Sequence, residues 1–338
     1  MPPAQGPVPR AGHRTGAPRP TRVAAPARAS YVAHLMSARR PALLLPAMAI
    51  NVLIASGTFL VAKSTLREFP PLVLALFRFT LATCALWPVT RLLRPGKRIA
   101  PEDRRRILLL GFLSVPANQA MFLYGMQWAS ASHAALLYAL TPTFIILIAA
   151  VRGARPSPRQ LAGIVLAFAG VLTLLLQRGL HFERRSLLGD LLILVAVVAW
   201  ALYLYLGRGV TRRYGPLLVT AESVAAGTLM FLPVGLLALG GFHPAATTTT
   251  GWSGLFYLAW LTSGVNYVIW FWGVEHLRPA ATAVWSNLQP PITALMAWGL
   301  LGEPLPAGFL VSAALVLGGV WIAQRSVPDG QPVDTEGA

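Results

Sequence analysis

The sequence predicts an all-α polytopic membrane protein whose ten transmembrane helices form two inverted five-helix repeats. The composition is strongly apolar: of 338 residues, 55% are hydrophobic and 12% charged, and the mean hydropathy is +0.60. A soluble domain needs more charge to cover its surface. Apolar segments long enough to cross a bilayer recur along the chain, and the second half repeats features of the first.

Ten segments of about 20 apolar residues are expected to span the membrane. Proline, glycine and arginine mark the connections, as in LLRPGKRIAPEDRRR and VRGARPSPRQ. The first repeat, residues 42–177, has spans at 42–63, 71–92, 106–126, 131–151 and 159–177. After an inter-repeat loop at 178–187, the second repeat, residues 188–324, has spans at 188–207, 216–239, 253–274, 279–301 and 306–324.

The two ends of the chain lie outside the repeats. Residues 1–41 form a basic tail rich in proline and alanine, and its lack of periodicity predicts disorder. Met36 is an alternative start of translation. The pair Arg39 and Arg40 faintly resembles a twin-arginine signal, but no persuasive cleavage site follows, so we interpret 42–63 as a retained helix. Residues 325–338 form a C-terminal tail.

The net charge of +17 would suggest nucleic-acid binding in a soluble protein. Here the basic residues gather in short loops and tails, where they act as orientation signals. The basic residues expected in outward-facing loops are Lys63, Arg67, Arg178, Arg184 and Arg185. All others except Arg78 fall on the side of the N-terminus. This bias predicts two cytoplasmic termini and no nucleic-acid partner, and the short loops and Arg- and Ala-rich composition suggest a bacterial inner membrane.

An internal repeat is visible at a nearly constant offset. An offset of 148 aligns Asn118 with Asn266, Gly125 with Gly273, and Pro142, Pro156 and Pro158 with Pro290, Pro304 and Pro306. An offset of 145 aligns Pro71 with Pro216 and Pro88 with Pro233. Five spans per copy invert the second copy in the membrane, an architecture typical of secondary transporters with a midplane substrate site. Arg155 and Glu303 share one repeat position, and the basic residue falls on the inner side.

Several stretches resemble the EamA-type members of the drug/metabolite transporter superfamily. They are SGTFLVAKSTLREFPPLVLALFRFTLA, ALLYALTPTFIILIA, AVWSNLQPPITALMAWGLLGEPL and LVLGGVWIA. The resemblance covers residues 42 to about 324 and includes Lys63 and the Arg78–Phe79 pair. Ser56 stands where the family often has tryptophan, and Arg155 stands where it has an acidic residue. The resemblance implies a small-molecule permease, often an exporter of amino acids or related metabolites.

Polar side chains converge on the middle of the predicted spans. At about 1.5 Å per residue they lie roughly 12–20 Å from the span ends. They are Asn51, Asn118, Thr141, Asn266, Asn287 and Gln289. Amides in hydrocarbon need partners, so we expect these side chains to face a wet cavity. The alternative is that they join helices as structural hydrogen bonds.

Prolines interrupt two equivalent spans at the same depth. Pro290 and Pro291 remove the donors for the carbonyls of Ser286 and Asn287, and Pro142 does the same for Tyr138. Such carbonyls are tolerated where they meet water, substrate or a protein donor. We therefore expect both spans to bend and to act as hinges. The alternative is a kink that only improves packing.

Two charged residues and an aromatic face complete the candidate site. Arg78 and Glu222 lie within spans, where charge is costly and therefore a functional candidate. They enter from opposite faces, so a water or substrate bridge fits better than a direct pair, and Glu222 is the candidate for a coupling proton. Arg78 could instead snorkel outward. Tyr267 and Trp270 could stack on a substrate or simply pack.

The residues favour a secondary transporter, because the sequence lacks the motifs of the rival classes of protein. An enzyme would need clustered acids or a metal motif, and an ATP-driven pump would need a phosphate-binding loop. We expect no cofactor or metal, with a small molecule and lipid as partners. Neutral or zwitterionic substrates are favoured over nucleotide sugars or organic phosphates, which want several midplane cations. A channel or scaffold is the rival from another class.

Overall fold

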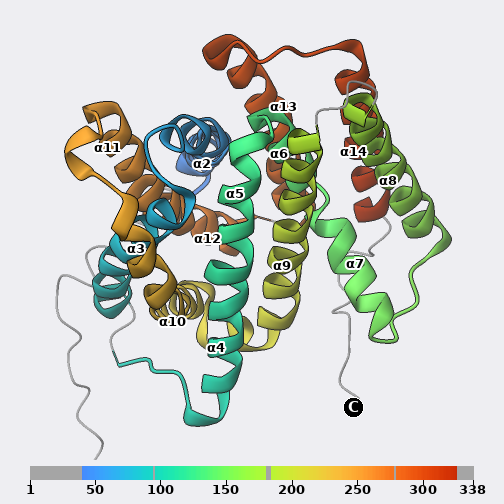
Figure 1. Ribbon diagram of the computed structural model, residues 1–338. Helices are drawn as coiled ribbons and strands as arrows, with labels where there is room; N and C mark the ends of the chain where they lie inside the picture. Colours follow the sequence, from blue (N-terminus) through green and yellow to red (C-terminus); the bar gives the residue numbers. More distant parts are fainter. Residues whose placement is uncertain (1–39, 94–95, 180–183, 278, 326–338) are drawn as a thin grey trace, which may run out of the picture. The chain divides into compact units, whose positions relative to one another are not determined.

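The computed structural model describes residues 40–93, 96–179, 184–277 and 279–325. The predictions made for residues 1–39, for the middle of the inter-repeat loop and for residues 326–338 lie outside these ranges. The described residues are helical apart from short connections, with no strand among them. A helical element occupies each of the ten predicted span positions (Figure 1).

The first repeat breaks two of its five spans into shorter pieces. Spans one, two and five are α2 (Arg40–Thr65), α3 (Pro71–Leu93) and α8 (Pro158–Gly179). Span three comprises η1 (Pro101–Asp103), α4 (Arg104–Phe112), the π-helical η2 (Leu113–Gln119) and α5 (Ala120–Trp128). Span four comprises α6 (Ala131–Tyr138) and α7 (Thr141–Val151).

The second repeat breaks only one span. Its continuous helices are α9 (Arg184–Tyr214), α10 (Pro216–Leu237), α13 (Pro279–Leu301) and α14 (Ala307–Arg325). Span eight comprises α11 (Thr249–Phe256), the π-helical η5 (Tyr257–Val265) and α12 (Asn266–His276). The short helices η3 (Ala238–Gly241) and η4 (Pro244–Ala246) precede it.

Eight of these positions are long and apolar enough to cross a membrane when the consecutive helical elements of a span are counted together, over the described residues. The other two positions are α11–η5–α12 and α13. The span predicted at 188–207 is longer in the structure, because α9 extends to Arg184 and Tyr214 beyond its apolar middle. These helices give a multi-pass membrane protein.

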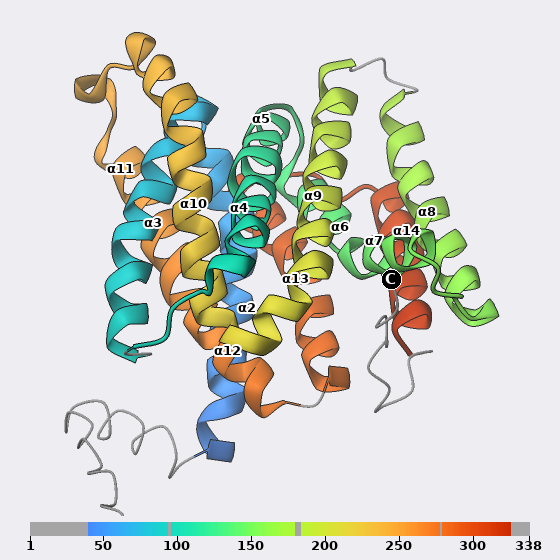
Figure 2. The same ribbon diagram turned by 90° about the horizontal axis from the view of Figure 1, so that it is seen from below.

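Equivalent spans of the two repeats pack against each other in antiparallel directions. In the pair α3–α10, Leu76 lies against Gly235, and Thr83 lies against Thr228. In the pair α8–α14, Gly163 lies against Ala323 and Gly170 against Val316. Both helix pairs lie side by side in the two views (Figure 1, Figure 2). Because equivalent helices run in opposite directions, the repeats are inverted.

The contacts between the first and third spans also follow the repeat symmetry: each such contact has an equivalent one in which the two repeats are interchanged. Helix α2 packs against η5 and α12, and its counterpart α9 packs against η2 and α5. At the closest approaches, Met48 lies against Gly273, and Ile193 lies against Gly125. Met48 and Ile193 are equivalent at the offset of 145, and the glycines at 148. The duplication read from the sequence is therefore present in the packing.

Each repeat carries a π-helical turn in its third span. The backbone N–H of Ala120 donates to Val115 O and that of Asn266 donates to Leu261 O, five residues back in each case. Pro116 removes one α-helical donor from η2, and Ser263 Oγ takes up the Leu258 carbonyl in η5 at 3.0 Å. Single π turns often occur at functional sites. Here they end beside Asn118 and Asn266.

Candidate functional site

A cavity of about 1100 Å³ lies between the two repeats. It reaches the side of the protein that carries residues 96–106, 152–158 and 208–215, which we call the basic face. Exposed arginines line that mouth: Arg106, Arg152, Arg208 and Arg212. Toward the other side, the opposite face, the cavity ends at buried residues such as Thr58 and Thr262, whose hydroxyls lie 3.0 Å apart. Among the described residues, the cavity lining therefore extends to the basic face and includes no residue from the connections at the opposite face.

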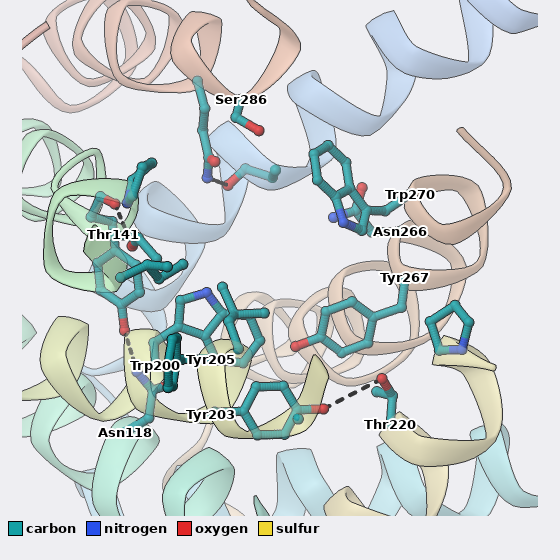
Figure 3. A pocket seen from close by; sticks show the side chains of 18 of the residues that line it. Asn118, Thr141, Trp200, Tyr203, Tyr205, Thr220, Asn266, Tyr267, Trp270 and Ser286 are labelled. Carbon is teal, nitrogen blue, oxygen red and sulfur yellow. Dashed lines mark hydrogen bonds between the residues drawn. The ribbon is translucent and has the colours of Figure 1, made fainter. Parts of the chain in front are cut away.

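Thirteen predicted site and hinge residues line this cavity. They are Asn51, Arg78, Asn118, Tyr138, Thr141, Pro142, Asn266, Tyr267, Trp270, Ser286, Asn287, Gln289 and Pro290. Figure 3 shows several of them around an open space, with Asn266, Tyr267 and Trp270 across from Asn118 and Thr141. The substrate-binding role of each residue stays a prediction.

The asparagines are held by hydrogen bonds between equivalent pairs of positions, although the donating side chain lies on opposite members of the two pairs. Asn118 Nδ2 donates to the Ala196 carbonyl of α9 at 2.7 Å. Asn51, at the position equivalent to Ala196, donates from Nδ2 to both the carbonyl and Oδ1 of Asn266, at 3.0 and 2.7 Å. These asparagine side chains therefore join neighbouring helices by hydrogen bonds and also line the cavity, so the two alternatives considered for them are not exclusive.

A chain of polar side chains connects α3 to the end of α6. Arg78 Nη1 donates to Gln119 Oε1 at 3.1 Å, and Gln119 Nε2 donates to Asn118 Oδ1 at 2.6 Å. Asn118 Nδ2 in turn lies 2.9 Å from the hydroxyl of Tyr138, the last residue of α6. Gln119 is a cavity residue that the sequence reasoning missed. Its neighbour Asn118 and its mid-span position were the available signals.

The fourth span is interrupted where Pro142 was expected to bend it. Helix α6 ends at Tyr138, α7 begins at Thr141, and the carbonyl of Tyr138 accepts a hydrogen bond from Thr141 Oγ1 at 2.7 Å. A side-chain donor thus replaces the backbone donor that proline lacks. The interruption itself matches the expectation.

In the equivalent ninth span, α13 continues through Pro290 and Pro291 without the interruption found in the fourth span, and the expected bend and hinge there stay a prediction. Its neighbours secure it: Ser56 Oγ donates to the Gln289 carbonyl, and Gln289 Nε2 donates to the Ala55 carbonyl, each at 3.2 Å. Asn287 Nδ2 donates to Gln324 Oε1 at 2.9 Å. Pro291 is exposed and does not line the cavity.

Aromatic side chains cover much of the cavity wall. Trp200 and Tyr203 of α9 stack with their ring centroids 4.9 Å apart, and Tyr205 lies nearby on the same helix (Figure 3). At the end nearest the opposite face, three aromatic rings meet edge to face with centroids 5.6–5.8 Å apart: Phe59, Phe122 and Tyr138. Except for Tyr138, sequence reasoning missed these residues, because an aromatic residue in an apolar span gives no signal of which face it occupies.

Polar contacts hold α6 on the side where the cavity is closed. Glu303 accepts hydrogen bonds from the backbone N–H groups of Ala131 and Ser132, at 2.8 and 3.2 Å, and from Ser132 Oγ at 2.7 Å. A carboxylate is favoured at a helix N-terminus. His133 Nδ1 lies 3.1 Å from Asp190 Oδ2, and Asp190 is fully buried. We call these contacts of Glu303 and Asp190 the α6 latch.

Two segments of the chain, residues 43–176 and 187–324, match the model of the EamA-like transporter family. The chain belongs to this family. A transporter of Archaeoglobus fulgidus without a characterised function is 28% identical over 81% of this chain and 95% of its own length. A probable terminal-alkyne amino-acid exporter of Streptantibioticus cattleyicolor is 29% identical over 82% of this chain and 92% of its own length.

The fold is shared with a solved structure as well. A crystal structure superimposes with a TM-score of 0.57 at 21% identity and covers 84% of this chain and 97% of that chain. The match supports the arrangement of helices in this EamA-like protein. The two segments matched by the family model agree closely with the two repeats inferred from the sequence.

Glu222 lies elsewhere than expected for this EamA-like protein. Its carboxylate is 3.4 Å from Arg91 Nη2, the two side chains are 29% and 38% exposed, and neither residue lines the cavity. The assignment of Glu222 to the cavity therefore needs correction: the residue lies close enough to the basic face to pair with the arginine at the end of α3. Within the described residues, no group of three or more His, Cys, Asp or Glu side chains is arranged to hold a metal.

Proposed function

We propose that the protein is a secondary transporter that exports small neutral or zwitterionic metabolites, such as amino acids, by alternating access. The observation that carries the proposal is the cavity between the inverted repeats, which opens at the basic face and is closed at the opposite face. A carrier needs such a one-sided state, whereas a conducting channel needs a path open at both ends. The activity involves no bond making or breaking, so we infer no enzymatic role.

The orientation and the cargo follow from charge and from the relatives. By the positive-inside rule we place the basic face and both termini in the cytoplasm of a bacterium, with the helices in the inner membrane. The cavity would then load from the cytoplasm. The relative named as a probable amino-acid exporter supports amino acids as cargo. The arginines at the mouth favour a second candidate, organic-phosphate or nucleotide-sugar exchange. Against it, Arg78 is the one basic residue near the middle of the membrane among the described residues that line the cavity.

Counterflow in proteoliposomes tests this proposal. Vesicles containing the full chain are loaded with unlabelled L-phenylalanine, diluted into trace radiolabelled L-phenylalanine, and compared with vesicles loaded with glucose 6-phosphate. We expect saturable uptake that internal phenylalanine accelerates. Flux that does not saturate and ignores the internal solute would indicate a channel. Acceleration by glucose 6-phosphate alone would favour the second candidate.

A further inference from the structure

Arg78 carries a charge that its protein neighbours leave uncompensated. Its side chain is on the cavity wall and only 3% exposed. Nε donates to Ser263 Oγ at 3.3 Å, Nη1 donates to Gln119 Oε1 at 3.1 Å, and the ring of Phe79 lies 5.0 Å from the guanidinium carbon. All three partners are neutral. Among the described residues no carboxylate lies within ion-pair distance, and Nη2 has no hydrogen-bond partner.

Other arginines of the chain show what compensation looks like. Arg91, on the same helix as Arg78, pairs with Glu222 at 3.4 Å, and Arg213 of α9 pairs with Asp103 at 2.9 Å. A buried charge within a membrane is costly unless a counter-charge lies beside it. None of the described residues supplies one to Arg78, which lies on the wall of a cavity, so a solute in that cavity could provide the counter-charge.

The rest of the cavity has the same sign of charge. Among the described residues that line it there is no aspartate or glutamate, and its mouth is lined by arginines. A cleft lined by one sign of charge concentrates ions of the opposite sign. The cavity therefore favours anionic groups and disfavours a cationic amine without an acid group. One guanidinium at depth balances a single carboxylate, which it binds well through paired N–H groups.

The walls next to the open space suit a flat apolar group. The stacked Trp200 and Tyr203 of α9 and the side chains of Tyr267 and Trp270 of α12 approach that space from different sides (Figure 3). Aromatic rings pack well against other flat groups. We propose that Arg78 anchors the carboxylate of the transported compound, and that transported compounds join a carboxylate to a flat apolar group. This inference rests on the proposed transport function.

A series of small ligands tests the anchor on the unmodified protein. Binding of 3-phenylpropionate, L-phenylalanine, phenethylamine and phenyl phosphate is measured by tryptophan fluorescence of the purified full chain. We expect both carboxylates to bind, and phenethylamine to bind on the order of 10-fold more weakly, because it forfeits a charged hydrogen bond. Equal binding of phenethylamine, or no binding of either carboxylate, would overturn the proposal. Tighter binding of phenyl phosphate would replace the carboxylate class by phosphate.

Two substitutions on the same helix separate Arg78 from general effects. Arg78→Gln should weaken carboxylate binding by about 10-fold or more and remove the preference over phenethylamine, whereas Arg91→Gln should change neither. Arg78→Lys keeps the charge and should keep the preference with lower affinity. An unchanged preference in Arg78→Gln would refute the anchor, and if that variant does not fold, the ligand series decides. Selective binding without flux would refute the transport function but leave the anchor standing.

Discussion

The hydroxyl groups of Thr83 and Thr228 lie 3.2 Å apart, and the two residues occupy the same position in the two repeats at the offset of 145. A residue can touch its own counterpart only where the symmetry axis passes between them. The axis that relates the inverted repeats therefore crosses the α3–α10 interface at this pair. If exchange of the repeats converts one state of the transporter into the other, this contact is retained in both.

Bridging Thr83 to Thr228 should therefore leave transport intact. In a Cys84→Ser background, we expect the Thr83→Cys/Thr228→Cys protein, joined by a short cleavable thiol reagent, to retain most of its flux in proteoliposomes. A bridge between Ser132→Cys and Glu303→Cys should abolish flux, because the α6 latch must open. If the first bridge stopped flux and cleavage restored it, exchange of the repeats would not describe the transport cycle.

Weakening the latch should open the cavity toward the opposite face. Glu303→Ala removes a carboxylate that accepts three hydrogen bonds at the start of α6. Hydrogen bonds to a charged group contribute about 1.5–3 kcal/mol each, so we expect at least a tenfold rise in the labelling rate of Ala135→Cys by a membrane-impermeant thiol reagent added from that face. Glu222→Ala is the matched control, since it removes a carboxylate outside the cavity. Equal rates in the two variants would show that Glu303 does not hold α6.

Two adjacent glycines of α14 should respond differently to a methyl group. A Cβ on Gly319 would collide with backbone atoms of Ala167 and Gly163, whereas a Cβ on Gly318 would only touch Leu166 at 4.0 Å. Overpacking typically costs about 1–3 kcal/mol, so Gly319→Ala should lower the melting temperature in detergent. Gly318→Ala should not, because alanine favours a helix more than glycine. Similar melting temperatures for the two variants would mean that α8 and α14 can move apart without loss of stability.

Pro142 should matter more for turnover than the double proline of α13. The fourth span is broken beside Pro142, whereas α13 runs unbroken through Pro290 and Pro291. Replacing Pro142 by alanine restores a backbone donor and favours a continuous helix. We expect Pro142→Ala to slow counterflow several-fold and Pro290→Ala/Pro291→Ala to slow it less, at matched protein yield. The reverse order would place the working hinge in α13.

The sequence predicts the fold well because hydropathy and internal similarity are long-range signals averaged over many residues. It also predicts the amides of the cavity, since Asn51, Asn118 and Asn266 have no acceptable place in lipid. The same logic misplaced Glu222, because depth along a span does not tell which face a residue occupies or whether an arginine can reach it. The unbroken α13 could not be foreseen either, because a proline within a span does not by itself show whether the helix ends there or continues through it.

The α6 latch has no counterpart in the other repeat. Arg155 stands at the position of Glu303, Pro279 and Ala280 at those of Ala131 and Ser132, and Leu45 at that of Asp190. If the cavity closes at the basic face during the proposed transport cycle, it does so without these polar contacts, and the latch then favours the arrangement described here over the opposite one. Such a bias cannot choose the net direction of flow, which the solute gradients determine. If the protein alternates as proposed, the same bias gives a solute a higher apparent affinity from the basic face than from the opposite face.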